Sequence, residues 1–537
     1  MSSAVCKSPD TEVVAKSVVG PTEAIADARE ASGRSTYRQI LRSSALIGGS
    51  SGLNLLIGIV RTKAMAILLG PAGFGLMGAF TSIADLARSV AEMGINSSGV
   101  RQIAEAAGSE DAARIGRTLT VLRRTAIALG LLGAVALAAF CRPIAMLTFG
   151  DDHYAASVAL LALALFFRLV ADGQGAALQG MRRIGDLARV GVLGALLGTA
   201  VSIPIVYWLR EQGVALSLVA VAAMSLLVSW WYSRKVKVTR PSLSMAEVRH
   251  EAKGLLHLGL AFMASGLLTL GAAYIVRTFL IRHNGLAEAG LYQSAWTIGG
   301  MYVSFILQAM GADFYPRLVG AFKDRGECNR LVNEQAHISI LLASTGVIAT
   351  LTLAPIVLHV FYSRDFAAAA AVLRWICLGM TLRVVTWPMG YIIIASGQRK
   401  FLIGTELAWA VAYLSMSWLL ISRFGLNGAG MAFFLSYVAH GAIVYPVARK
   451  LTGFRWSIEN LRTACLMVIA VVAVSAGFFL LSDLLANATG LFITALCCVY
   501  TVRTLVRLTS PDLSRIPVLR LLRRKGSRSK NQSSTAA

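Results

Sequence analysis

The residues of this chain that could do chemistry are charged side chains set inside long apolar stretches. Eight of them form two groups, the basic Arg61, Lys63, Arg168, Arg277 and Arg383 and the acidic Asp85, Glu92 and Asp172. A guanidinium fork forms bidentate hydrogen bonds to phosphate oxygens, so the basic group predicts a site for an anionic, phosphorylated ligand. The acidic group predicts proton or sodium sites. A charge at the bilayer centre costs at least roughly 2.5–3.5 kcal/mol, so such residues tend to face a wet cavity and to be functional.

A simpler interpretation of the same charges is mutual neutralisation. Arg168 and Asp172 stand four residues apart, as do Arg88 and Glu92, and on a helix that spacing brings two side chains together. Arg88 and Arg374 could also extend toward a membrane surface. Both interpretations depend on helices that cross a membrane.

The composition predicts such helices. Of the 537 residues 56% are hydrophobic and 15% are charged, whereas an ordinary soluble domain has roughly 25% charged residues. Apolar stretches of about 20 residues are typical of transmembrane helices. We therefore expect an all-α polytopic membrane protein with about fourteen transmembrane helices. They lie near residues 44–69, 73–95, 125–148, 155–178, 187–208, 213–232, 254–281, 288–314, 336–362, 367–395, 401–422, 426–448, 462–483 and 488–508.

The distribution of positive charge predicts the orientation. In a soluble protein a net charge of +24 would suggest a nucleic-acid partner. Here most of the loop Lys and Arg residues follow even-numbered helices, as Arg123, Arg234 and Arg317 do. Cytoplasmic loops of membrane proteins collect these residues. We therefore expect both termini in the cytoplasm and no nucleic-acid partner.

An internal repeat divides the chain. Val60-Arg61-Thr62 recurs as Val276-Arg277-Thr278, Gly75 recurs as Gly290, and Pro143 recurs as Pro355. Arg168-Leu169-Val170 matches Arg383-Val384-Val385 in the same series. Six spans return the chain to the same side of the membrane, so the two copies must be parallel. Transporters built in this way bind substrate at the interface of the repeats.

The repeat predicts a domain organisation around a central cationic cavity that the paired arginines line. The expected parts are a disordered cytoplasmic tail (1–35), an N-lobe of six helices (36–235), a cytoplasmic linker (236–253), a C-lobe of six helices (254–450), two extra helices (451–508) and a basic cytoplasmic tail (509–537). The last tail could contact anionic membrane lipids.

Several motifs of other function classes are missing or occur in the wrong context. The phosphate-binding pattern G-x-x-x-x-G-K-[ST] does not occur, so the sequence gives no support for a nucleotide-driven pump. Gly48-Gly-Ser-Ser-Gly52 matches the nucleophile-elbow pattern, but it begins a membrane helix and no strand precedes it. The seven cysteines show no metal-ligand spacing. We therefore expect neither an enzyme nor a bound cofactor or metal.

Three segments carry a resemblance to a known family: Leu69-Gly-Pro-Ala-Gly-Phe-Gly75, Gly94-Ile-Asn-Ser-Ser-Gly99 and Gly311-Ala-Asp-Phe-Tyr-Pro-Arg-Leu318. With them, residues 36–450 resemble the Wzx-type polysaccharide flippases of the multidrug/oligosaccharidyl-lipid/polysaccharide exporter superfamily. The resemblance implies two six-helix lobes in a V around a cationic cavity. It also implies transport of undecaprenyl-diphosphate-linked oligosaccharide repeat units across the bacterial inner membrane, for O-antigen or exopolysaccharide assembly. Basic cavity residues of the family correspond here to Arg61, Lys63 and Arg277.

The resemblance also implies partners and a mechanism. The substrate would be a polyprenyl-diphosphate-linked glycan, and a polysaccharide polymerase and export machinery are possible protein partners. The two lobes would rock in alternating access, with Arg61, Lys63 and Arg277, together with the pair Arg168 and Arg383, binding the diphosphate. Asp85, Glu92 and Asp172 would be candidates for ion coupling.

Three alternatives stay open. Lipid II flippases of the same superfamily often have fourteen spans, which matches the extra helix pair here. A cation-coupled multidrug antiporter would need an acidic cavity, whereas the paired positions hold arginines. A membrane enzyme such as a polymerase or ligase would need a large periplasmic loop, and no loop on that side exceeds about ten residues.

Overall fold

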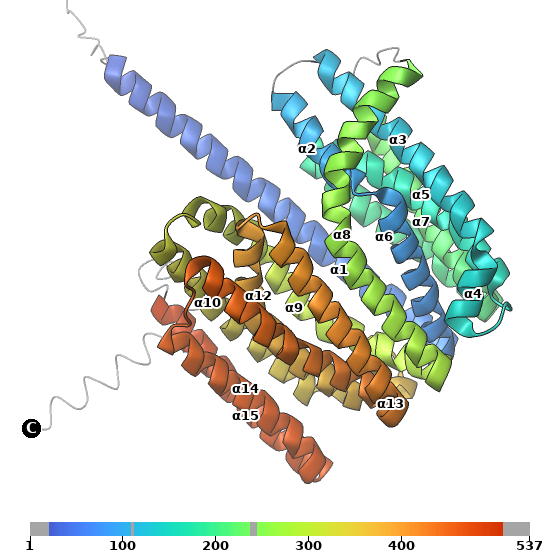
Figure 1. Cartoon of the computed structure of the whole chain (residues 1–537), viewed down its shortest axis with the longest axis vertical. Helices are drawn as coiled ribbons and strands as arrows, with labels where there is room; N and C mark the ends of the chain where they lie inside the picture. The colour runs from blue at the N-terminus through green and yellow to red at the C-terminus, as the bar shows by residue number, and fades with distance from the viewer. Residues whose placement is uncertain (1–20, 109–111, 237–243, 509–537) are drawn as a thin grey trace, which may run out of the picture.

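The computed structural model describes residues 21–108, 112–236 and 244–508, and every regular element in these ranges is a helix (Figure 1). The N-terminal part contains α1 (Pro21–Glu92), α2 (Ile95–Gly108), α3 (Ala112–Ala139), α4 (Cys141–Phe149), α5 (Ala155–Gly180), α6 (Ile184–Leu209), η1 (Arg210–Gln212) and α7 (Gly213–Ser233). The rest contains α8 (Met245–Asn284), α9 (Leu286–Ala321), α10 (Arg325–Thr352), α11 (Ala354–Phe361), η2 (Arg364–Phe366), α12 (Ala369–Ala395), α13 (Arg399–Thr452), α14 (Ile458–Leu480) and α15 (Asp483–Leu508).

The helices are long and apolar, as the composition predicts. In the described part of the chain nine of them are long and apolar enough to cross a membrane. Three of these, with 44, 50 (α6 to α7 taken together) and 54 residues, exceed twice the length of about 20 residues that one crossing needs. Each expected span falls largely on helical residues. The all-α multi-pass fold is therefore confirmed, and the count of fourteen separate crossings stays a prediction.

Breaks in the backbone repeat along the chain with the offset of the sequence repeat. Gly70 (φ 64°, ψ −173°) and Gly285 (φ 87°, ψ 175°) stand 215 residues apart and take almost the same conformation. Arg210 (φ 52°, ψ −131°) and Gly425 (φ 54°, ψ −132°) form a second such pair at the same spacing. Positive φ values are uncommon at residues other than glycine, as at Arg210, and each pair also agrees in ψ, so chance does not account for these agreements. The turns between helices thus repeat together with the sequence, and the exact lobe boundaries stay predictions.

The helices gather in two groups. Figure 1 shows α2 to α7 together on one side and α9 to α13 on the other, with α8 between them. We call α1–α7 the N-half and α8–α13 the C-half. The first part of α8 packs on the N-half, where Leu256 contacts the buried cluster around Ile103 and Leu122. Arg117 and Glu251 pair at 3.7 Å in the same region.

The two halves meet where α1 crosses α9 at Gly75 and Gly290. A methyl group on Gly75 would overlap the carbonyl oxygen of Leu286, and one on Gly290 would overlap the carbonyl oxygen of Pro71. These two glycines are equivalent in the repeat, so they lie where a twofold axis relating the halves would pass. Only residues without a side chain allow so close a crossing. We call this part of the molecule the crossing end.

Further contacts join the halves near the crossing end. The hydroxyl groups of Thr148 in α4 and Tyr274 in α8 are 2.6 Å apart. Arg282 Nη1 donates to the carbonyl oxygen of Met146 at 2.8 Å. Phe74 meets Tyr362 edge-on, with ring centroids 5.3 Å apart. Aromatic packing and hydrogen bonds therefore hold the halves together at this end.

The extra helices α14 and α15 pack on the outside of the C-half, where Figure 1 shows them at the edge of the molecule. Asn460, which is 2% exposed, donates to the carbonyl oxygen of Asn333 in α10 at 2.7 Å. Its Oδ1 lies 2.8 Å from His337 Nδ1. Thr345 of α10 and Thr501 of α15 have their hydroxyl oxygens 2.9 Å apart. Both added helices are therefore fixed to α10.

Two expected boundaries differ from the structure. Helix α1 begins at Pro21, so residues 21–35, expected in a disordered tail, are helical. This segment is rich in Ala, Glu and Arg, which favour helices. Helix α8 begins at Met245, inside the expected linker, where Ser244 and Glu247 form a capping box. Hydrogen bonds from Ser244 lower the pKa of Glu247. The basic tail 509–537 lies outside the described residues.

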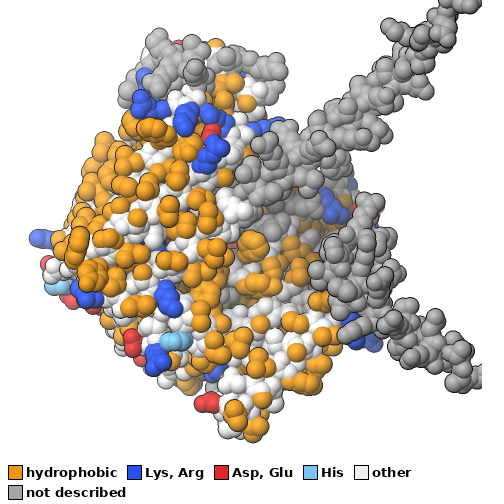
Figure 2. All heavy atoms as spheres, turned by 180° about the vertical axis from the view of Figure 1, so that it is seen from behind, with side chains coloured by type: hydrophobic (Ala, Val, Ile, Leu, Met, Phe, Trp, Pro, Cys, Tyr) orange, Lys and Arg blue, Asp and Glu red, His pale blue; other side chains and the backbone are white. Residues whose placement is uncertain are grey.

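The surface carries the band that a bilayer requires. Figure 2 shows hydrophobic side chains over most of one face, with Lys and Arg at its upper end and others toward its lower left. Large apolar side chains such as Leu132, Trp208 and Phe492 are 66%, 77% and 65% exposed. Exposure of so much apolar surface to water would be unfavourable, whereas in a bilayer this surface contacts the hydrocarbon chains of the lipids.

Candidate functional site

An ion pair between two helices of the N-half is the starting point of the site. Asp85 lies in the part of α1 that follows the break at Gly70, and Arg168 lies in α5. Arg168 Nη1 is 3.2 Å from Asp85 Oδ1, with side chains 49% and 29% exposed. Arg61, from the first part of α1, lies within electrostatic range of Arg168. The fold thus brings together three residues that the sequence separates by up to 107 positions.

Arg277 brings the C-half into the same site. It is 9% exposed in α8, and its Nη2 donates to Gln293 Oε1 in α9. Arg277 interacts electrostatically with Asp85, although Nε has no hydrogen-bond partner among the described residues. Asp85 is therefore flanked by arginines from both halves. We call Arg61, Asp85, Arg168 and Arg277 the charged cluster.

A second set of charges continues along the same two helices. Arg88 Nη1 is 2.9 Å from Asp172 Oδ2 and 3.5 Å from Glu92 Oε2. The expected pair of Arg88 with Glu92 is thus present. The expected pair of Arg168 with Asp172 is not what the structure shows, because each pairs instead with a residue of α1. Facing helices offered closer partners than the next turn of the same helix.

The pair Arg88–Asp172 borders a polar cavity of about 590 Å³ inside the N-half. Hydroxyl and amide side chains make up much of its wall, and three glycines without side chains widen the cavity. The lining residues are Arg88, Asn96, Ser97, Val100, Ala171, Asp172, Gly175, Ala176, Gln179, Leu187, Val190, Gly191, Gly194, Ser225 and Ser229. Within this wall Ser229 donates to Gln174 Oε1 at 2.7 Å.

Lys63 occupies a different position from the charged cluster. It follows Arg61 by two residues, which places it about 200° around the helix. Lys63 is exposed and shares its face of α1 with Val60 and Ile67, which are 61% and 60% exposed. The structure therefore separates two basic residues that the sequence analysis grouped together.

Arg383 also lies apart from the charged cluster. Its electrostatic neighbours are Glu406 and Tyr437, both in α13. Its repeat mate Arg168 pairs with Asp85, whose own repeat position is Gly300. The arginines thus repeat between the halves, whereas their carboxylate partners do not.

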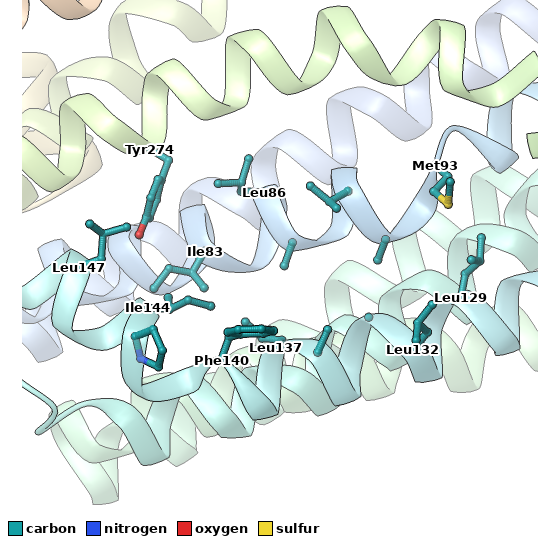
Figure 3. Close-up of a pocket in the computed structure, with 16 residues that line it drawn as sticks. Ile83, Leu86, Met93, Leu129, Leu132, Leu137, Phe140, Ile144, Leu147 and Tyr274 are labelled. Carbon is teal, nitrogen blue, oxygen red and sulfur yellow. The ribbon is translucent and has the colours of Figure 1, made fainter.

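An elongated apolar groove lies between α1, the α3–α4 segment and α8 (Figure 3). Its volume is about 640 Å³. The lining residues are Ile83, Leu86, Ala87, Val90, Ala91, Met93, Leu129, Leu132, Gly133, Ala136, Leu137, Phe140, Pro143, Ile144, Leu147 and Tyr274. The Tyr274 hydroxyl is bonded to Thr148, so the groove presents almost no free polar group.

Sequence reasoning missed several polar residues around the site. Gln293 accepts from Arg277, and Tyr292 and Tyr413 form a buried hydroxyl pair at 2.9 Å in electrostatic contact with the same arginine. No spacing rule joins these residues to Arg277 of α8, because Tyr292 and Gln293 lie in α9 and Tyr413 lies in α13. A polar residue in an apolar stretch was the only available signal.

The site has the chemistry of an anion-binding centre. Four arginines (61, 88, 168 and 277) face three carboxylates (85, 92 and 172), so one positive charge is unmatched if all are ionised. A buried guanidinium with an unpartnered Nε can accept a further anion through charge-assisted hydrogen bonds. Within the described residues no group of His, Cys, Asp and Glu could hold a metal ion.

Comparison with known proteins places the chain among polysaccharide-related membrane proteins. A family model described as "Polysaccharide biosynthesis protein" matches residues 64–371. The "Lipid III flippase" of Escherichia coli (strain K12) is 23% identical over 396 residues, which cover 72% of this chain and 92% of that protein.

Two solved structures share the fold. One is the inward-facing conformation of a multidrug resistance MATE family transporter of the MOP superfamily, with TM-score 0.63 and 17% identity over 74% of this chain and 94% of that one. The other is the lipid II flippase MurJ in an inward closed conformation, with TM-score 0.61 and 13% identity over 87% of this chain and 100% of that one.

Proposed function

This chain belongs to the polysaccharide biosynthesis protein family, and we propose that it is a flippase for a lipid-linked glycan in the bacterial inner membrane. The family match includes Arg168 and Arg277, and the relative with 23% identity is itself named a flippase. The observation that carries the proposal is the charged cluster. It joins arginines of both halves around Asp85 and leaves a donor of Arg277 free for an anion.

We propose an undecaprenyl-diphosphate-linked oligosaccharide repeat unit as the substrate. Arg61, Arg168 and Arg277 would bind the diphosphate, because guanidinium groups match phosphate oxygens in charge and geometry. Lys63 and Arg383 would act at an earlier or later stage of transport, since they lie outside the charged cluster. The sugar polymer would be O-antigen or exopolysaccharide, made with a polymerase and export machinery as partners.

The mechanism we propose is alternating access of the two halves. The fold is similar to two structures described as inward-facing or inward closed, and the halves meet at the crossing end. We place the crossing end toward the periplasm and both termini in the cytoplasm. An inside-negative potential favours outward movement of an anionic head by about 2.3 kcal/mol per charge per 100 mV. Asp85, Glu92 and Asp172 are candidates for any coupled ion.

A second candidate is a lipid II-type flippase. The likeness to MurJ covers 87% of this chain, against 74% for the MATE transporter. A cation antiporter is less well supported, because the membrane carboxylates of the N-half are all paired with arginines.

The test of the proposal is a deletion of the gene followed by analysis of the polyprenyl-linked glycans. We expect a complete repeat unit to accumulate on the cytoplasmic leaflet, with rescue by the wild-type gene and not by a normally expressed Arg277→Ala variant. Accumulation of lipid II with arrested growth would favour the second candidate. Normal surface polysaccharide with new sensitivity to cationic drugs would contradict both flippase functions.

A further inference from the structure

The apolar groove has the shape of a slot for a chain. Along α1 its lining runs from Ile83 to Met93, about 15 Å, and along α3 it runs from Leu129 to Leu137, about 12 Å, before the chain turns at Phe140 into α4 (Figure 3). Its volume of about 640 Å³ falls inside the range of roughly 300–1,000 Å³ of ligand pockets. An elongated apolar slot fits a hydrocarbon chain better than a compact molecule.

Small residues create the space. Ala87 and Ala91 on α1 face Gly133 and Ala136 on α3. A methyl group on Gly133 would stand 2.5 Å from Ala91 Cβ, so the two helices touch at this point and form the floor of the groove. Larger side chains here would fill the slot.

The repeat shows what a filled version of this surface looks like. In the C-half the position of Ala87 is taken by Tyr302, whose ring packs on Gly346 and whose hydroxyl donates to the carbonyl oxygen of Leu342 at 3.1 Å. Helix α3 ends at Ala139 and α10 ends at Thr352, an offset of 213, so Gly346 takes the position of Gly133 and Thr345 takes that of Leu132.

Helix α15 covers that surface of the C-half. Thr345 contacts Thr501 of α15 at 2.9 Å, and Thr352 contacts Thr494 at 3.4 Å. In the N-half no described helix takes this place, and small residues line the corresponding slot. The halves thus differ at one repeated surface, closed in the C-half and open in the N-half.

The groove and the charges lie on two faces of one helix. On α1, Ile83, Leu86 and Val90 share one face, and Asp85 and Arg88 lie about 100–200° around from them. Both faces border α8, where Tyr274 of the groove precedes Arg277 of the charged cluster by about one turn. A molecule with an anionic head at Arg277 could therefore place its tail in the groove.

We propose that the apolar groove binds the polyisoprenoid tail of the transported lipid while its diphosphate head is at the charged cluster. The inference rests on the flippase function proposed above and adds a site for the tail. Burial of isoprenoid surface against Ala87, Leu132 and Ala136 holds the tail at the seam between α1 and α8. The head then changes sides of the membrane while the tail stays in apolar surroundings.

Photo-crosslinking tests whether a polyprenyl tail occupies the apolar groove. A photoreactive residue replaces Leu132, which lines the groove, or its neighbour Leu131, which is 58% exposed but does not line it. The protein sits in vesicles of phosphatidylethanolamine and phosphatidylglycerol with a radiolabelled polyprenyl diphosphate. We expect labelling at position 132 to exceed that at 131 about tenfold, which corresponds to about 1.4 kcal/mol of preference. Equal labelling, or competition by added phosphatidylglycerol, would mean bulk lipid and would overturn the inference.

Tryptophan substitutions at two alanine positions test the role of the tail in transport. Ala136→Trp fills the groove, and Ala138→Trp adds the same ring at an exposed position outside it. We expect flipping of the lipid-linked glycan to fall about tenfold in the first variant only. Equal flipping rates in both variants would contradict the proposed tail site and leave the flippase function intact. Selective labelling at position 132, together with a wild-type protein that flips no glycan, would uphold the tail site and reject the flippase function.

Discussion

At Arg277 a guanidinium group is 9% exposed and donates one hydrogen bond to Gln293, and its Nε has no partner in the described part of the chain. A buried cation is costly unless a counter-charge and hydrogen bonds compensate it. Asp85 provides part of that charge, but Arg168 shares it. An anionic ligand would complete the compensation, which makes Arg277 the residue where binding should depend most on a single side chain.

The first prediction compares two basic residues. Arg277→Ala should weaken binding of a polyprenyl diphosphate about 10-fold to 100-fold, the effect of losing one charge-assisted hydrogen bond. Lys63→Ala should change binding less than about threefold, because Lys63 lies on the other side of α1 from Arg61. Fluorescence titration of purified protein measures both. Similar losses in the two variants would contradict the assignment of the charged cluster.

A second prediction concerns the pair Asp85–Arg168. Asp85→Asn and Arg168→Ala should each reduce the transport rate. The double variant should transport no more slowly than the slower of the two single variants. The coupling expected for contacting residues is about 0.5–3 kcal/mol. The exposed pair Arg101–Glu105, at 2.9 Å, is the control and should show additive, small effects. Additivity at Asp85–Arg168 would show that the two residues act independently.

At the scale of elements, the crossing of α1 and α9 depends on two glycines. Gly75→Ala should lower the thermal midpoint and slow transport, since the added methyl group overlaps the carbonyl oxygen of Leu286 and must push the halves apart. Overpacking of this kind costs about 1–3 kcal/mol. Gly58→Ala, in the same helix with open space around it, should stabilise or leave the protein unchanged. Equal midpoints for the two variants would rule out a tight crossing.

The attachment of α14 to α10 gives another element-scale prediction. Asn460→Ala removes the partners of His337 and of the Asn333 carbonyl, so the free energy of unfolding should fall by about 1–3 kcal/mol. Thermal unfolding in detergent measures it. Asn487→Ala is the matched control, because among the described residues Asn487 bonds to Asp483 of its own helix alone. A larger effect in the control would mean that α14 is held by apolar packing alone.

At the scale of the whole molecule, the hydrogen bond between Thr148 and Tyr274 joins the two halves near the crossing end. Tyr274→Phe removes about 1 kcal/mol from this contact. That loss changes the ratio of molecules with joined halves to molecules with separated halves about fivefold. Spin labels at the exposed positions Asp152 and His283 report the separation of the halves. We expect longer distances in the variant and unchanged distances in Tyr207→Phe, whose ring is 57% exposed. An unchanged distribution in Tyr274→Phe would place the moving contact elsewhere.

The parts of this protein that sequence alone predicts are those set by local chemistry. Long apolar stretches had to become membrane helices, since backbone groups in lipid must bond within the helix. The repeat was visible in Arg61 and Arg277 and in Gly75 and Gly290, and the backbone breaks at Gly70 and Gly285 follow it. The family match is consistent with the resemblance that the motifs indicated.

Tertiary structure decided how the charges are used. Asp85 could have paired with any nearby arginine, and the packing of α1 on α5 selected Arg168. Arg383 lies in α12 beside Glu406 of α13, apart from the charged cluster, and α1, α3 and α8 leave a groove at Ala87 where the C-half has Tyr302. Sequence spacing orders residues along one helix, whereas ion pairs and cavities depend on which faces of different helices meet. That is a property of the whole packed chain.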